Sequence, residues 1–193
     1  MIGAKSQKSI AGVAAFDQKK PFDAFVMGLN EPVQELVIHF SRPFQGTVSI
    51  RIVADGAQSR CVAEVIAEGG DLSARIGKVK GDLTWGAWGE FCRRLLENYQ
   101  TWRWSGVYGT DLIQEVACWT MTLRSASPKE GLVRWNTLIN IRGFDTWPDS
   151  WNLVRQALVR ILLPLYPEGA KRALAKDALM KFLAAKAQIR HNR

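Results

Sequence analysis

Four segments of this chain alternate apolar and polar residues, and this alternation constrains the fold more than any other feature of the sequence. In one of them Leu36, Ile38 and Phe40 fall on one side of an extended chain, while Glu35 and His39 fall on the other. Successive side chains of a strand point to opposite faces of a sheet. The alternation therefore predicts strands that each have one buried face. The four predicted strands are 33–40, 46–54, 114–124 and 131–142.

The residues between these strands predict how the strands connect. Residues 41–46 and 127–131 contain the Ser, Pro and Gly that turns favour, so each segment joins its neighbours into a hairpin. Residues 61–67 alternate as a further strand, and a fourth strand of that group is expected around 72–79, after a Gly-Gly pair. The predicted sheet is antiparallel, with about six strands in two groups of hairpins.

A helical period replaces the alternation in three other segments. Apolar residues recur at intervals of three and four over 84–100, which predicts an amphipathic helix. Thr146 is a predicted N-cap before a second helix at 149–163, and the Ala, Leu and Lys of residues 168–189 favour a third. Strands and helices grouped in this way are typical of an α+β fold. We therefore expect the sheet to be covered by one central helix and two C-terminal helices.

The length of 193 residues, 47% of them hydrophobic, is sufficient for one domain with its own core. We expect a basic N-terminal arm over 1–20 and a single domain over 21–193, in which 146–193 is a basic helical segment. The core is expected where the apolar faces of sheet and helices meet. Its predicted members are Trp88, Leu95, Trp119, Trp135, Ile139, Trp151, Leu158 and Ile161.

Positive charge is concentrated at the two ends of the chain. The formal net charge is +8. Residues 1–20 hold four Lys and one Asp, and residues 151–193 hold nine Lys or Arg against two acidic residues. The body between them holds 13 basic and 15 acidic residues, so it is nearly neutral. This asymmetry indicates an anionic partner, of which nucleic acid is the leading class.

Few residues suit catalysis. The two histidines, His39 and His191, have no second ligand at the spacing of a zinc site, and no phosphate-binding glycine loop occurs. The three cysteines, Cys61, Cys92 and Cys118, form no CxxC pair and are expected to be reduced core thiols. No apolar stretch is long enough for a signal peptide or a membrane span. We expect a cytoplasmic protein that is not an enzyme, needs no cofactor or metal, and does not bind membranes.

Two features are candidate binding sites. Trp102, Arg103 and Trp104 follow the central helix, and alternate residues can present two indoles on one surface, which stacks bases or anchors a protein partner. The basic C-terminal segment is the second candidate, because most of its cations fall on one helix face that can bind phosphates. The predicted nucleic-acid-binding residues are Arg155, Arg160, Lys171, Arg172, Lys176, Lys186, Arg190, Trp102, Arg103 and Trp104.

Three interpretations follow. The leading one is a non-catalytic binding or assembly subunit whose basic C-terminal helical face contacts the backbone of RNA or single-stranded DNA. The alternative is a protein-interaction module within a larger complex, in which the same tryptophans are anchors. The third is a metal-dependent enzyme that uses Asp55, Glu64 and Glu68, which lie near predicted strand ends.

Overall fold

Seven strands of the chain form one sheet, in the order β4-β3-β2-β1-β6-β7-β5. All neighbouring pairs are antiparallel except β5 and β7, which are parallel. The computed structural model describes residues 19–104, 106–109, 117–129, 132–144 and 146–184. The strands are β1 Val33–Arg42, β2 Gly46–Asp55, β3 Arg60–Glu68, β4 Lys78–Leu83, β5 Gly106–Tyr108, β6 Cys118–Lys129 and β7 Leu132–Phe144.

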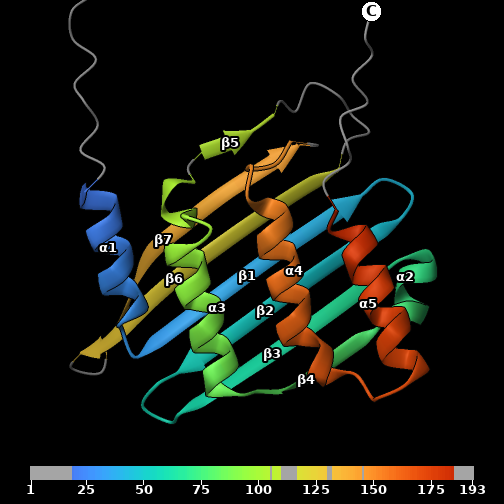
Figure 1. Cartoon of the computed structure of the whole chain (residues 1–193), viewed down its shortest axis with the longest axis horizontal. Coiled ribbons are helices and arrows are strands. Elements are labelled where there is room, and N and C mark those ends of the chain that lie inside the picture. The colour runs from blue at the N-terminus through green and yellow to red at the C-terminus, as the bar shows by residue number, and fades with distance from the viewer. Residues whose placement is uncertain (1–18, 105, 110–116, 130–131, 145, 185–193) are drawn as a thin grey trace, which may run out of the picture.

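The longer helices lie side by side across one face of this sheet (Figure 1). We call this the helix-covered face, and the opposite face, on which none of the described helices lies, the open face. The short helix α2 lies beyond β3 and contacts α5 at the same end of the sheet. The helices are α1 Lys19–Leu29, α2 Gly70–Arg75, α3 Trp85–Glu97, α4 Trp151–Leu162 and α5 Ala170–Phe182. The predicted α+β class with an antiparallel sheet covered by helices is confirmed.

Local sequence explains where α3 begins. Thr84 is its N-cap, and the Thr84 hydroxyl accepts a hydrogen bond of 3.2 Å from the backbone N–H of Ala87. Trp88, Phe91 and Leu95 then recur at helical spacing and are all buried against the sheet. The indole N–H of Trp88 donates to the side-chain oxygen of Gln34 at 2.8 Å, so this polar group is satisfied inside the core.

Four stacked aromatic rings fill the core under the amino-terminal end of α4. The ring of Trp147 lies 4.7 Å from Trp119, 4.9 Å from Phe40 and 5.1 Å from Trp151, measured between ring centroids. Such pairs add about 0.5–1.5 kcal/mol each beyond the apolar area they bury. Gly143 makes room for this stack, because a Cβ there would lie 2.1 Å from the indole nitrogen of Trp119.

Three segments differ from the sequence prediction. The strand expected at 72–79 is replaced by α2 and then β4, because Gly69 and Gly70 adopt positive φ angles that end the preceding strand and start a helical turn. Helix α1 was not predicted; its Phe25 is buried in the core. Helix α4 begins after Ser150 rather than after Thr146, so the predicted N-cap was wrong. Residues 110–116, in the strand expected at 114–124, lie outside the described residues.

Trp135 is not a core residue, contrary to the prediction. Leu123 pairs with Ile139 but Arg124 pairs with Thr137, so Leu138 is an extra residue in β7. Such a bulge reverses the side-chain alternation beyond it. Ile139 therefore points into the core as predicted, whereas the Trp135 side chain lies on the open face and is 39% exposed.

Candidate functional site

The open face is a broad platform whose side chains form rows across the strands. One central row runs Lys80, Glu64, Arg51, Val37, Thr122 and Asn140, from β4 to β7. Side chains directly opposite each other on neighbouring strands approach within about 4.5–5.5 Å, so each row is a set of contacting groups. Polar and charged residues dominate these rows, in contrast to the apolar helix-covered face.

A buried carboxylate lies at the centre of the open face. Glu35 is only 1% exposed although no described helix covers it. The Nε of Arg51 donates to Glu35 Oε1 at 2.7 Å, and Arg124 donates to the other oxygen, Oε2. A carboxylate buried in this way needs such partners, because an unpaired buried charge is costly. Glu35 therefore fixes two guanidinium groups side by side on the open face.

The side chains of both arginines remain accessible. The exposed fraction of the side chain is 60% for Arg51 and 38% for Arg124. The guanidinium carbon of Arg124 lies 4.2 Å from the ring centroid of Trp135, which is a cation–π contact. Two positive charges share one negative charge here, so the group formed by Glu35, Arg51, Arg124 and Trp135, which we call the arginine–tryptophan cluster, has a net positive charge.

Further cations surround this cluster. Lys80 and Arg142 are exposed and form no ion pair with another described residue. Lys78 pairs with Glu64 at 3.6 Å. The three central rows of the open face thus hold five cations and three carboxylates: Arg51, Lys78, Lys80, Arg124 and Arg142 against Glu35, Glu64 and Asp82. The middle of the open face is therefore net positive.

A shallow hollow lies beside the cluster, over β2, β3 and β4. Its volume is about 310 Å³. Its lining residues combine three cations, one carboxylate and two valines: Arg51, Arg60, Lys80, Glu64, Val53 and Val62. On the adjacent strands β1 and β2 of the same face, His39 and Ser49 share a hydrogen bond of 2.9 Å between Nδ1 and Oγ. The cations of the hollow can hold an anion, and His39 and Ser49 place an imidazole nitrogen within hydrogen-bond distance of a hydroxyl, which is the pairing that a general base and a nucleophile require.

The cations predicted from the sequence lie on the other side of the molecule, and the structure uses two of them internally. Arg155 donates to the carbonyl oxygen of Met180 at 3.0 Å, and burial lowers the pKa of Arg155. Arg172 donates to the carbonyl oxygen of Tyr166 at 2.9 Å and pairs with Glu168 at 3.3 Å. These two guanidinium groups therefore stabilise the packing of α4 and α5.

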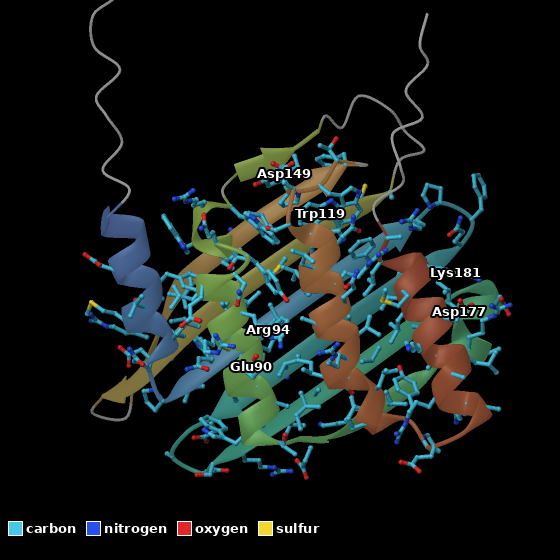
Figure 2. All side chains as sticks on the ribbon, in the orientation of Figure 1. Glu90, Arg94, Trp119, Asp149, Asp177 and Lys181 are labelled. Atoms are coloured by element: carbon cyan, nitrogen blue, oxygen red, sulfur yellow. The ribbon has the colours of Figure 1, made fainter. Side chains whose placement is uncertain are left out.

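The remaining predicted cations are either exposed on α4 and α5 or lie outside the described residues. Arg160, Lys171 and Lys176 are exposed and form no ion pair with another described residue. Lys181 pairs with Asp177 at 2.9 Å, one turn away on α5, as Figure 2 shows. Lys186 and Arg190 lie outside the described residues. Three unpaired cations thus remain on the described part of the predicted basic helix face.

Trp102 and Trp104 both contribute to the packing of the core. Both are half-buried and pack against the core, and the ring of Trp104 lies 6.4 Å from that of Trp151. Arg103 is exposed, with its guanidinium carbon 4.7 Å from the ring centroid of Trp102. The two indoles are mainly packing groups. Sequence spacing alone could not show this, because it depends on the position of α4.

The residues of the arginine–tryptophan cluster were missed because they lie on separate strands. The alternation in β1 correctly placed Glu35 and His39 on the polar side of the strand, which was the only available signal. Arg51 and Arg124 come next to Glu35 only through the pairing of β1 with β2 and β6. That register is a tertiary property, and the bulge that turns Trp135 toward Arg124 gives no local sequence signature.

Among the described residues, no three His, Cys, Asp or Glu side chains gather closely enough to hold a metal ion. Asp55 accepts hydrogen bonds from the backbone of its own turn, and Glu64 pairs with Lys78. No described helix combines the length and the apolar character needed to cross a membrane.

Comparison with protein-family models, with curated proteins and with solved structures finds no match for this chain.

Proposed function

We propose that this protein is a non-catalytic nucleic-acid-binding module that holds a single strand of RNA or DNA on the open face of its sheet. The observation that carries the proposal is the arginine–tryptophan cluster, in which buried Glu35 fixes two accessible guanidinium groups and one of them stacks on an indole. Fixed guanidinium groups match the geometry of phosphate oxygens, and they lose little entropy on binding because they are already ordered.

The surrounding residues suit an extended polyanion better than a small anion. Lys80 lies on β4 and Arg142 on β7, so unpaired cations flank the cluster on both sides across five strand-to-strand gaps of about 4.8 Å each. Phosphates along a strand can contact these cations, while a base stacks on the exposed surface of the Arg124–Trp135 pair. Stacking and phosphate contacts of this kind tolerate any base, so binding is expected to be strong at low salt and weakly sequence-dependent.

The test compares two matched pairs of cations. One variant replaces Lys80 and Arg142 on the open face by Gln, and the control replaces Lys171 and Lys176 on α5 by Gln. Each removes two exposed cations that form no ion pair with another described residue, so the change in net charge is equal. The affinity for a single-stranded oligonucleotide is measured over a range of salt concentrations for both RNA and DNA.

The open-face variant is expected to bind more weakly and to lower the slope of log affinity against log salt by about 1.4, at about 0.7 per lost phosphate contact. The α5 variant is expected to keep the parent slope. The reverse result would place the contact on the C-terminal helices. No binding by the parent at about 50 mM salt would contradict nucleic-acid binding on either surface.

A second candidate function, a protein-interaction module within a larger complex, rests on exposed apolar side chains of the outer helix layer. Leu153 on α4 and Leu174 on α5 are 50% and 51% exposed. Exposed leucines are common on protein surfaces, so this observation is weaker than an ordered cluster of charged groups. A protein partner would be favoured if the parent protein failed the oligonucleotide test.

A further inference from the structure

A second cavity lies on the other side of the molecule, between α3 and α4. Its volume is about 230 Å³. The described residues that form its apolar wall are Leu83, Ala87, Phe91, Ala157, Ile161 and Pro164. An apolar cavity of about 150 Å³ binds benzene, so this one has room for a single ring or a short alkyl chain. It is separate from the open face, which is on the opposite side of the sheet (Figure 1).

Small side chains on two helices create the space. Helices α3 and α4 are neighbours on the helix-covered face (Figure 1), and each contributes an alanine to the cavity wall, Ala87 from α3 and Ala157 from α4. Larger residues at these positions would fill the gap between the helices, as they do elsewhere in the core. Phe91 and Ile161 are almost fully buried and close the cavity from below.

Four charged residues line the rim, and three of them are neutralised by partners. Glu90 accepts hydrogen bonds from Arg93 at 2.9 Å and from Arg94 at 2.7 Å, and these bonds lower the pKa of Glu90 to about 2. Figure 2 shows Glu90 and Arg94 beside each other on α3. Asp82 pairs with Arg60 at 3.3 Å.

Arg160 is the remaining charge on the rim. It is exposed and forms neither a hydrogen bond nor an ion pair with another described residue. An apolar cavity with one unpaired guanidinium at its edge is complementary to a ligand that has an apolar body and a single negative charge. A cationic ligand would instead be repelled, and a neutral one would leave Arg160 without a partner.

We propose that this cavity binds a small apolar monocarboxylate, with its chain or ring between Ala87 and Ala157 and its carboxylate on the guanidinium of Arg160. The site contains none of the residues of the arginine–tryptophan cluster, and Asp82 on its rim is the residue that it shares with the central rows of the open face.

The probes are octanoate and octan-1-ol, which have the same chain length and differ in charge. Binding to the full-length chain is measured by titration calorimetry and by the shifts of backbone amide resonances. Arg160→Gln removes the guanidinium, and Lys171→Gln is the control for loss of one exposed cation elsewhere on the helix layer. Ala87→Leu and Ala157→Leu each fill the cavity from a different helix, and thermal unfolding shows which of them keeps the fold.

The parent is expected to bind octanoate more tightly than octanol, with amide shifts confined to α3, α4 and the cavity-lining residues at the end of β4 and just after α4. Arg160→Gln should weaken octanoate binding about tenfold, the usual effect of losing one charge-assisted hydrogen bond, and should leave octanol binding unchanged. Lys171→Gln should change neither. A folded Leu variant should lose both ligands.

Three results would overturn the proposal. Absence of saturable octanoate binding by the parent at millimolar concentration would mean that the cavity is not a ligand site. Equal octanoate affinity in the parent and in Arg160→Gln would exclude the carboxylate contact. Unchanged binding in a folded Leu variant would locate the ligand elsewhere.

Discussion

The two faces of the sheet are built from the same strands but depend on different forces. On β1, the residues Leu36, Ile38 and Phe40 face the helices and are completely buried. The alternate residues Glu35 and His39 face the open side, where ion pairs and hydrogen bonds with neighbouring side chains take the place of contacts with helices. Burial of apolar area is the dominant favourable term in folding, so the helix-covered face determines the fold. The open face can vary in its chemistry without loss of the core.

Glu35 is an exception to this contrast between a buried apolar face and an exposed polar face. It is as buried as a core residue, yet only neighbouring side chains of the open face cover it. The long apolar stems of Arg51 and Arg124 can shield the carboxylate while their charged ends stay in water. An arrangement of this kind costs desolvation energy and gives little net stability. A role in binding explains such an arrangement better than a role in folding, which is why the proposed function rests on it.

The largest expected difference in stability is between two variants, each of which replaces one tryptophan on one face of the sheet. Trp119→Ala on the helix-covered face should lower the free energy of unfolding by about 3–5 kcal/mol, because it removes a fully buried ring that stacks on Trp147 and Trp151. Trp135→Ala on the open face should lower it by less than about 1 kcal/mol, since the indole is partly exposed and loses mainly its contact with Arg124.

Denaturation by urea measures both values. If Trp135→Ala proved as destabilising as Trp119→Ala, the two faces would not differ in their role in folding. The same Trp135→Ala variant should bind an oligonucleotide about tenfold more weakly, because a base loses one stacking surface.

The sequence predicted much of this comparison, and the failures have identifiable physical causes. Alternation identified β1, β2, β6 and β7 and the helical period identified α3, because each pattern is local. The prediction that Trp135 faces the core was wrong because one extra residue, Leu138, reverses the side-chain alternation in β7. The prediction of a strand at 72–79 was wrong because two glycines with positive φ angles permit a helical turn there. The strand propensity of the following residues contains no information about that turn.

The candidate site was less predictable than the fold. Its charged residues Glu35, Arg51 and Arg124 come from three strands and meet only through the sheet register, which depends on packing of the whole domain. The prediction of a basic helix face did not include the hydrogen bonds that Arg155 and Arg172 donate to backbone carbonyls. The number of cations in a segment does not distinguish a cation that binds a partner from one that stabilises the packing of a helix.

A smaller effect is expected for the carboxylates of the open face itself. Glu35→Ala should lower the free energy of unfolding by about 1.5–3 kcal/mol, since two guanidinium groups lose a charge-assisted partner. Glu64→Ala removes a carboxylate whose partner, Lys78, is largely exposed, and should cost less than about 1 kcal/mol. Urea denaturation at low and at high salt measures both. Equal costs would mean that the centre of the open face is no more specialised than its edge.

The smallest expected effect on stability appears at alkaline pH and concerns the helix-covered face. Burial and the carboxylate of Asp82 raise the pKa of Cys61 from 9.0 to about 11, and burial raises the pKa of Tyr166 to about 12. The folded protein therefore keeps these protons when the unfolded chain has already lost them. Stability from this source is complete below about pH 9 and falls as the pH rises toward 11–12.

The same difference between faces can be read from thiol reactivity. Cys61 and Cys92 are buried under the helices, whereas Cys118 is exposed on the open face of β6. Because the thiolate is the reactive form and needs access to the reagent, one thiol per chain should react rapidly with a maleimide at pH 8, and the other two only after denaturation. Cys118→Ser should abolish the rapid phase and leave the slow one. Two rapidly reacting thiols in the parent would show that the helices do not exclude the reagent from their face of the sheet. That result would contradict the contrast between the two faces.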